Sequence, residues 1–368
     1  MRLIALLFLL VGWIVPAVAD PVRITDALGR VIELPKPPER LVVTLHYEEI
    51  TAVAGAEGWK RVVAMSRAPW ESWRPAIYAE YLKAIPLLAS IPDTGDIEDQ
   101  SFSAEKVIAV RPDVLVLSNW GFETAKAQVE RIQQAGIPVV VLDYHAQDLA
   151  KHLASTRALG RLFGTEARAE ELARFYEREY TGLVARIAAA QAGKPKPKAY
   201  VEFGREGAET IGNSYNKAMW GRILTLLGAE NLAEGRIPGA WGPLNAETVI
   251  AENPDAIFLA SSSWMTRPKA VKTGYGVDAA LTRATLLPYL ARPGWKDLKA
   301  VRNGNVNAVE HGLSRTLFDI VAMQFIAKRL YPDALADLDP EKTFREIHAK
   351  YLPVAYSGTW FLTIGETK

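Results

Sequence analysis

Residues 103–117 read SAEKVIAVRPDVLVL, and residues 245–259 read NAETVIAENPDAIFL. The two stretches align without a gap at an offset of 142, with eight identical residues among the fourteen positions from 104 to 117. Each begins with a residue that favours a helix N-cap, continues as a short amphipathic helix and breaks at Pro-Asp. The apolar run that follows is typical of a buried strand.

A helix that feeds a buried strand is the repeating unit of a parallel α/β sheet. The fold class we predict is therefore α/β, with two Rossmann-like lobes that have parallel central sheets. Their ligand cleft would lie between the lobes. The length of 368 residues allows two domains with cores of their own.

Composition excludes some functions. Of the chain, 49% is hydrophobic and 23% charged, with a net charge of +1, whereas a nucleic-acid surface would show a marked basic excess. We therefore expect no nucleic-acid partner. The chain contains no dinucleotide fingerprint, G-x-S-x-G elbow or H-E-x-x-H motif. An α/β enzyme is thus the less favoured alternative to a binding protein.

The first nineteen residues have the pattern of a signal peptide. Arg2 supplies the positive charge, residues 3–15 form an apolar core, and residues 17–19 read Ala-Val-Ala. The core is shorter than the roughly 20 residues that span a bilayer, so cleavage near Ala19 is favoured over a membrane anchor. Since the chain has no cysteine, it has no disulfides and no acceptor for N-terminal lipid. We expect a soluble protein in the periplasm.

Residues 165–191 have apolar residues at helical spacing and contain no proline. At 1.5 Å per residue they would form a rod of roughly 40 Å. We predict an N-terminal lobe at 20–150, a connecting long helix within 151–195, and a C-terminal lobe with a tail at 196–368. A continuous helix bends only with loss of backbone hydrogen bonds, which predicts small lobe closure.

Four stretches resemble one family, the periplasmic substrate-binding proteins of ABC importers in the iron-siderophore, haem, cobalamin and metal class. They are TDALGR…LPKPPERLVV at 25–43, the two repeat copies, and GWKDLKAVRNGNV at 294–306. The ending YSGTWFL at 356–362 and the loop at 215–221 also resemble a molybdate- and tungstate-binding subgroup.

The resemblance implies two lobes joined by one long helix, no enzymatic activity and no intrinsic cofactor. It also implies a partner, an ABC transporter permease dimer in the inner membrane, which a monomeric receptor would serve. Relatives dock onto permease arginines through a glutamate on each lobe, and the matching positions are Glu105 and Glu247. The alternative is that each carboxylate only stabilises the positive end of its helix.

Candidate ligand-binding residues follow the predicted strands, because ligands of open α/β sheets bind beyond the carboxyl ends of strands. Trp120 and Trp264 end repeat-equivalent strands and would face each other as a wall for a flat chelate, unless they pack in the core. Arg67 and Arg315 could neutralise an anionic ligand. The other candidates are His46, Tyr47, Tyr215, Asn216, His311 and Ser314.

We expect a ligand that contains a metal, most favourably a ferric siderophore-type iron(III) chelate. The alternative is a metal oxyanion, molybdate or tungstate, held by Tyr, Asn and Arg donors. A bare zinc or manganese ion is less favoured, although imidazoles suit zinc. His46, His145 and His311 stand at separate predicted strand ends and have no tight metal-ligand spacing.

Overall fold

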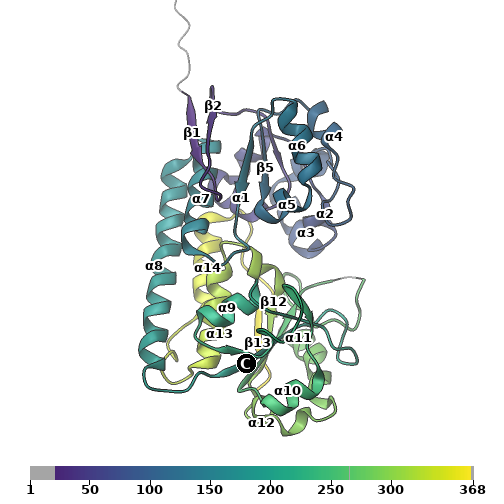
Figure 1. Ribbon diagram of the computed structural model, residues 1–368, viewed down its shortest axis with the longest axis vertical. Helices are drawn as coiled ribbons and strands as arrows, with labels where there is room; N and C mark the ends of the chain where they lie inside the picture. The colour runs from purple at the N-terminus through teal and green to yellow at the C-terminus, as the bar shows by residue number, and fades with distance from the viewer. Residues whose placement is uncertain (1–20, 265, 366–368) are drawn as a thin grey trace, which may run out of the picture.

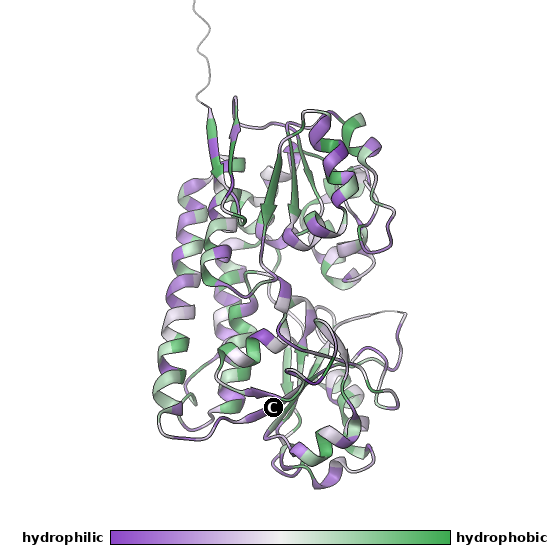
Figure 2. Ribbon diagram, in the orientation of Figure 1, coloured by the Kyte–Doolittle hydropathy of each residue, from purple (hydrophilic) through white to green (hydrophobic). Residues whose placement is uncertain are grey.

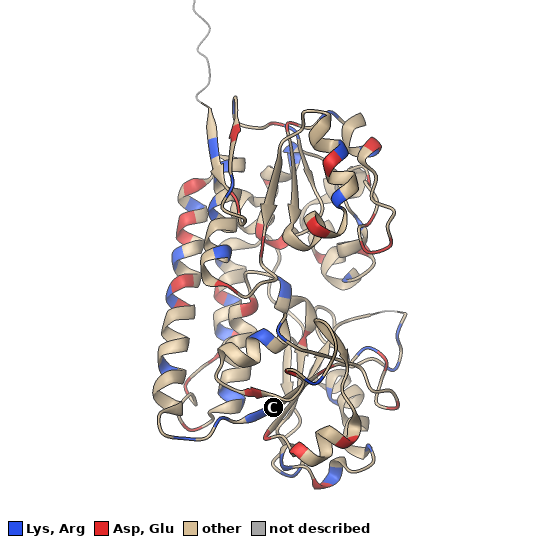
Figure 3. Cartoon of the chain, viewed as in Figure 1, with Lys and Arg blue, Asp and Glu red and all other residues tan. Residues whose placement is uncertain are grey.

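The chain folds into two α/β lobes stacked along the long axis of the molecule (Figure 1). The computed structural model describes residues 21–264 and 266–365, so the expected signal peptide lies outside the described residues. Helix α8 (Glu166–Gln191) runs along one side of both lobes and connects them. Its charged residues lie mainly in its first half, beside the N-terminal lobe (Figure 3). The predicted fold class is confirmed.

The N-terminal lobe is built on a parallel sheet in the order β4–β3–β5–β6. Alternate residues of β5 belong to two separate core clusters, Val114 and Val116 to one and Leu115 and Leu117 to the other. Both faces of the sheet are therefore covered, which explains the continuous apolar run in the sequence. The strands are β1 (Val22–Thr25), β2 (Val31–Leu34), β3 (Leu41–Val43), β4 (Val62–Met65), β5 (Val114–Ser118) and β6 (Val139–Leu142). The helices are α1 (Tyr47–Gly58), α2 (Ala68–Glu71), α3 (Pro75–Ala84), α4 (Ala104–Ala109), α5 (Asn119–Thr124), α6 (Lys126–Gln134) and α7 (Leu149–Phe163), with 3₁₀ turns η1 (Trp59–Arg61) and η2 (Pro86–Ser90).

The C-terminal lobe has a five-stranded sheet in the order β13–β12–β11–β7–β9, parallel except for β13. A separate two-stranded ribbon pairs β8 with β10. The strands are β7 (Lys198–Phe203), β8 (Asn213–Tyr215), β9 (Glu230–Asn231), β10 (Trp241–Pro243), β11 (Ala256–Ser261), β12 (Val306–Glu310) and β13 (Phe361–Thr363). The helices are α9 (Trp220–Leu226), α10 (Ala246–Glu252), α11 (Ala279–Leu286), α12 (Lys299–Arg302), α13 (Asp319–Leu330) and α14 (Pro340–Tyr351), with 3₁₀ turns η3 (Leu287–Ala291), η4 (Trp295–Asp297) and η5 (His311–Arg315).

The sequence repeat is a structural repeat, α4–β5 in one lobe and α10–β11 in the other. The aspartate of each copy accepts backbone hydrogen bonds from the chain next to the start of a neighbouring strand. Asp113 accepts hydrogen bonds from the backbone N–H groups of Glu39 and Arg40 at 2.7 and 2.9 Å, just before β3. Asp255 accepts one from the backbone of Lys198 at 2.9 Å, where β7 begins. The Pro-Asp break thus fixes the start of the neighbouring parallel strand in each lobe.

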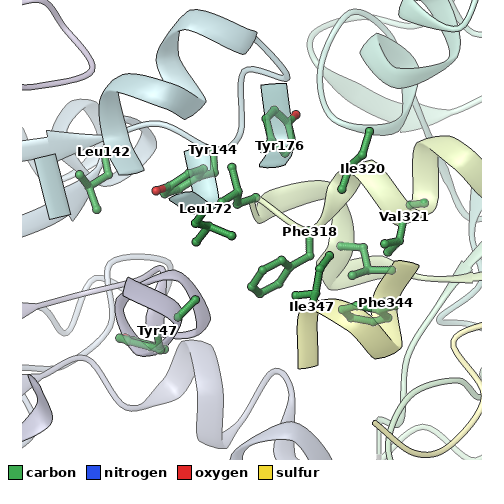
Figure 4. Close-up of a cluster of buried hydrophobic side chains, with 14 of the residues drawn as sticks. Tyr47, Leu142, Tyr144, Leu172, Tyr176, Phe318, Ile320, Val321, Phe344 and Ile347 are labelled. Atoms are coloured by element: carbon green, nitrogen blue, oxygen red, sulfur yellow. The ribbon is translucent and has the colours of Figure 1, made fainter. Parts of the chain in front are cut away.

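The lobes share one hydrophobic core. Figure 4 shows Tyr47 and Tyr144 of the N-terminal lobe beside Leu172 of α8 and Phe318 of the C-terminal lobe, all in one buried cluster. The tail contacts both parts of the molecule. Its strand β13 pairs with β12, and Arg168 on α8 donates to the backbone oxygens of Ala52 in the N-terminal lobe and Tyr351 in the tail, at 2.6 and 2.9 Å. Separation of the lobes would therefore have to disturb buried apolar contacts.

Candidate functional site

His311 directly follows β12 and forms the centre of an aromatic group on the C-terminal lobe. Its ring lies 4.5 Å from the ring of Phe203 and 6.1 Å from that of Tyr215, centroid to centroid. The indole Nε1–H of Trp220 donates to His311 Nδ1 at 3.0 Å. Because an indole N–H can only donate, Nδ1 carries a lone pair and the ring proton sits on Nε2. Burial lowers the pKa of His311 well below its usual value, so the ring is a neutral Nε2–H donor.

Two further histidines form the opposite wall. His46 precedes α1 in the left-handed conformation, with φ 64°, and its ring centroid lies 5.5 Å from that of His145. Both ring nitrogens of His46 and Nε2 of His145 are buried without a hydrogen-bond partner among the described residues. Burial lowers the pKa of His46, helped by His145, and lowers the pKa of His145 to about 3. Each ring is neutral near pH 7 and offers one donor.

Arg315 lies between the two walls. Its guanidinium is 5.5 Å from the centre of the Trp73 ring, on the other lobe. No ion pair or side-chain hydrogen bond joins it to any residue that the structure describes. Burial, and next the charge of Arg74, lowers the pKa of Arg315 from its usual value, but an arginine stays cationic in proteins. The cleft therefore holds a positive charge that no carboxylate of the described chain contacts directly, although Glu310 and Glu98 attract it from a distance.

Side chains that the sequence analysis missed tie the lobes together. Arg74 forms an ion pair with Glu48 and reaches across to Glu310, 3.6 Å away. Gln147 Nε2 donates to the backbone oxygen of Ser314 at 2.7 Å, from one lobe to the other. Of these, only Glu310 could have been found from the sequence, because it ends a predicted strand next to His311. Arg74 is paired directly with carboxylates, whereas Arg315 is attracted by Glu310 without a direct ion pair.

The space at this junction is small. The cavity lined by His46, Trp73, Arg74 and Arg315, among others, measures about 20 Å³, enough for about one water molecule. A larger hollow of about 800 Å³ lies at the amino ends of β3 and β4 and is lined by Arg40, Lys60 and Arg111, among others. We place the site at the small space, because ligands of parallel sheets bind beyond the carboxyl ends of strands and the unpartnered polar atoms gather there.

Three predicted ligand residues have other roles in the structure. Tyr47 is 2% exposed and its hydroxyl donates to the backbone oxygen of Ser66, so it belongs to the core. Arg67 donates to the backbone oxygens of Leu88, Ala89 and Ile91 and to the Tyr78 hydroxyl, and so fastens the segment after α3. Asn216 donates to the backbone of residues 237 and 239 and accepts from Gly235, which closes a loop. The side chains of Arg67 and Asn216 thus bond to local backbone groups, while Tyr47 borders the small cavity with its hydroxyl already used.

The two tryptophans predicted to line the cleft each pack within their own lobe. Trp120 lies in the first turn of α5 and packs, partly buried, against the core of its own lobe. Trp264 packs edge-on against Phe203, with ring centroids 5.1 Å apart. No ring contact among the described residues joins the two indoles, and the wall that they were predicted to form stays a prediction. Ser314 is buried and its hydroxyl donates to the backbone oxygen of His311 at 2.9 Å, so it supports the turn instead of offering a free donor.

Trp241 is an aromatic residue that the sequence analysis did not single out. It lies opposite Tyr215 in the β8–β10 ribbon, and its side chain is 53% exposed. Ser214 donates to the backbone oxygen of Val201 and therefore faces the lobe. Tyr215, in contrast to Trp241, is 4% exposed and belongs to the buried core cluster, with its ring beside that of His311.

The predicted docking glutamates lie on the outer surface. Glu105 and Glu247 are in the first turns of α4 and α10, and both are exposed. The carboxylate of Glu105 accepts from the Ser103 hydroxyl at 2.9 Å and meets Arg131 at 3.3 Å. Its own backbone N–H and then the Ser103 hydroxyl lower the pKa of Glu105, so it is ionised at neutral pH.

A bare metal site has no support in the described part of the chain. No three His, Cys, Asp or Glu side chains there are placed to hold one ion. Metal-bound histidines usually donate their second N–H to an acceptor, whereas His311 accepts from Trp220. Among the described helices, none combines the length and the apolar character that a bilayer span requires.

The chain is similar in sequence and in structure to known periplasmic binding proteins. The family model described as "Periplasmic binding protein" matches residues 42–310. The solved structure of a TroA-like periplasmic binding protein FepB from Veillonella parvula is 34% identical with a TM-score of 0.88, covering 94% of this chain and 100% of that chain. The molybdate-binding protein MolA of Haemophilus influenzae is 22% identical over 92% of this chain and 93% of its own. An uncharacterised ABC transporter substrate-binding lipoprotein of Bacillus subtilis, YvrC, is 20% identical over 86% of this chain and 88% of its own.

Proposed function

The chain belongs to the periplasmic binding protein family, and we propose that it captures a metal oxyanion, molybdate or tungstate, and delivers it to an ABC permease. Its relatives are substrate-binding receptors of ABC transporters and not enzymes, and so is this chain. The identity of the ligand is the part that we propose. We further propose export to the periplasm after cleavage near Ala19, with Glu105 and Glu247 as docking residues.

One observation carries the choice of ligand: Arg315 and three histidines that can each donate an N–H gather at the junction between the lobes, where Arg74 already engages the carboxylates of Glu48 and Glu310. Arg315 supplies a positive charge that forms no direct ion pair among the described residues and that Glu310 attracts only from a distance. His311 is held by Trp220 as an Nε2–H donor, and His46 and His145 each have a donor to give. A tetrahedral oxyanion has only acceptor oxygens and carries negative charge. Charge-assisted hydrogen bonds from arginine to such oxygens are the strong ones.

The size of the cleft supports a compact ligand. Pockets that enclose drug-sized molecules measure about 300–1,000 Å³, and the space between the lobes is about 20 Å³. A small anion requires much less separation of the lobes than an organic chelate does. The similarity to MolA, a molybdate-binding protein, agrees with this proposal and extends over nearly the whole of both chains.

A ferric siderophore-type chelate is the second candidate, because aromatic side chains surround the cleft. Trp73 lies under Arg315, Trp264 packs beside Phe203, and Trp241 is exposed next to Tyr215. Such rings stack well on the flat arms of an aromatic chelator. For this ligand the lobes would have to move apart and expose the shared core.

The test is calorimetric titration of the purified protein with sodium molybdate, sodium tungstate, sodium sulfate and a ferric catecholate. We expect molybdate or tungstate to bind and Arg315→Ala to weaken binding by about 10–100-fold, since hydrogen bonds to charged groups contribute about 1.5–3 kcal/mol. Arg302→Ala, an exposed arginine on α12, is the matched control and should bind as the wild type does. Tight binding of the catecholate with none of either oxyanion would overturn the oxyanion proposal in favour of the second candidate.

A further inference from the structure

Two isoleucines occupy equivalent places in the repeat and both are exposed. Ile108 on α4 is 36% exposed and Ile250 on α10 is 40% exposed. They differ by the repeat offset, and each stands three residues after a docking glutamate. Residues three apart lie on the same face of a helix, while the neighbouring Val107 and Val249 are buried. We call Glu105 and Ile108, together with Glu247 and Ile250, the paired surface.

Single exposed apolar side chains are common on proteins and need no explanation. Two exposed isoleucines at equivalent positions of a repeat do require an explanation. The large exposed apolar side chains of the described chain are Leu28, Val31, Ile108, Trp241, Ile250, Leu281 and Leu287. Among them only Ile108 and Ile250 are related by the repeat.

The local structure holds Ile250 at the surface. Gly294, with φ 78°, lies beneath it, and a Cβ on Gly294 would come within 2.5 Å of Ile250 Cδ1. The glycine therefore provides both a backbone conformation that other residues rarely adopt and the room in which the isoleucine sits. On the other helix, Glu105 has only an exposed ion pair with Arg131, which is weak and can be exchanged for another partner.

α4 and α10 lie on different lobes, both on the side of the molecule away from α8 (Figure 1). Figure 2 shows hydrophobic stretches on both helices, and Figure 3 shows acidic residues on them. A single partner that spans the lobes on this side can touch both helices. Because the two places are equivalent, such a partner would have to present the same recognition site twice.

We propose that Ile108 and Ile250 are apolar anchors that seat the two lobes on the two equivalent subunits of a membrane permease. Each subunit would offer a cationic side chain for the glutamate and, beside it, an apolar hollow for the isoleucine. The cations would orient the receptor, and burial of the isoleucines would hold it in place, since apolar area removed from water contributes about 25 cal/mol per Å². This inference rests on the proposed delivery to a permease, and it does not depend on which ligand is delivered.

The test uses the full-length processed receptor and its permease with the ATPase subunits, reconstituted in liposomes. The measured quantity is the receptor concentration that gives half-maximal stimulation of ATP hydrolysis. We expect Ile108→Ser and Ile250→Ser each to raise this concentration by about threefold or more and the double variant by about tenfold or more, in the range of interface hot spots. Leu281→Ser with Leu287→Ser, at exposed leucines outside the repeat, should leave it unchanged.

Calorimetric titration of every variant with the ligand is the control for an intact cleft. Because neither isoleucine is near the cleft, all variants should bind the ligand as the wild type does. If the wild type stimulates hydrolysis and the double isoleucine variant matches it, the apolar anchors are refuted while delivery to a permease stands. If the leucine control weakens stimulation as much as the isoleucine variant does, the anchors are likewise refuted. If the wild type does not stimulate the permease at all, the proposed function fails and this inference fails with it.

Discussion

Replacement of Trp220 by phenylalanine tests how the cleft is prepared for its ligand. Phenylalanine keeps an aromatic ring in the buried position but removes the Nε1–H that donates to His311 at 3.0 Å. His311 Nδ1 is then a buried acceptor without a partner. An unsatisfied buried group costs about 1–3 kcal/mol, and the smaller ring adds a cavity term of about 1 kcal/mol. We expect the free energy of unfolding to fall by about 2–4 kcal/mol.

The same replacement should also lower the affinity for the ligand, through the tautomer of His311. Without Trp220 the proton of His311 can sit on either ring nitrogen, and only the Nε2–H form presents a donor to the cleft. If about half of the molecules hold the wrong tautomer, the affinity for an oxyanion falls about twofold, and loss of ring orientation lowers it further. We expect a decrease of about two- to tenfold in calorimetric titration with molybdate.

Trp59 supplies the matched control. It is fully buried, its Nε1 donates to the Thr51 hydroxyl at 2.9 Å, and it lies behind Tyr47 and Trp70 without lining the cavity itself. Trp59→Phe should therefore destabilise the protein by a similar amount and leave the affinity unchanged. The ¹⁵N NMR shifts of the His311 ring report the tautomer directly. A protonated Nδ1 in the wild type at pH 7 would refute the reasoning, whatever the affinities are.

Two other predictions follow from the junction between the lobes. Burial, and next the charge of the neighbouring Glu48, raises the pKa of Glu49 to about 8. Folding therefore takes up a proton at neutral pH. As a result, the free energy of unfolding of the wild type falls as the pH rises from about 4.5 to 8. The variant Glu49→Gln keeps an acceptor for the Leu317 N–H. It should raise the melting temperature at pH 7 but not at pH 4. An equal rise at both pH values would contradict the assigned pKa. Small-angle scattering with and without molybdate should show little change in the radius of gyration, because the lobes share a core with α8, and a large compaction on binding would contradict this.

The fold could be predicted from the sequence because its signals are local. The helix cap, the Pro-Asp break and the apolar run of each repeat copy are readable along the chain, and each copy forms the expected helix and strand. Even the backbone agrees, since the equivalent residues Arg111 and Asn253 both have positive φ, 46° and 48°. The connecting helix was readable for the same reason: helical spacing persists over its whole length.

The candidate site was only partly predictable, because the position of a residue at a strand end does not give the direction of its side chain. Arg315 reaches Trp73 of the other lobe, whereas His311 packs among aromatic rings of its own lobe, and Tyr47 uses its hydroxyl within the core. Arg74 was missed altogether. It precedes α3, ends no strand, and becomes part of the junction only when the two lobes meet.

The ending YSGTWFL shows a related limit on reading a ligand from a motif. Trp360 donates to the backbone oxygen of Ser357 at 2.9 Å. Gly358 has φ 80°, and a Cβ there would come within 2.2 Å of the backbone oxygen of Gly274. These residues fasten the tail to the C-terminal lobe. The resemblance that they carry therefore concerns the fold of the tail and gives no evidence about the ligand.

The repeat and the ligand chemistry are separate features of this molecule. The repeated strands β5 and β11 end in Ser118 and Ser261, and the Ser261 hydroxyl is used within its lobe, where it donates to the backbone oxygen of Val309. The donors of the cleft instead follow β3, β6 and β12, which lie outside the repeat. Duplication of one helix–strand unit thus accounts for two similar lobes with equivalent outer surfaces. The specificity of the cleft depends on unrepeated residues, and for that reason the repeat alone does not identify the ligand.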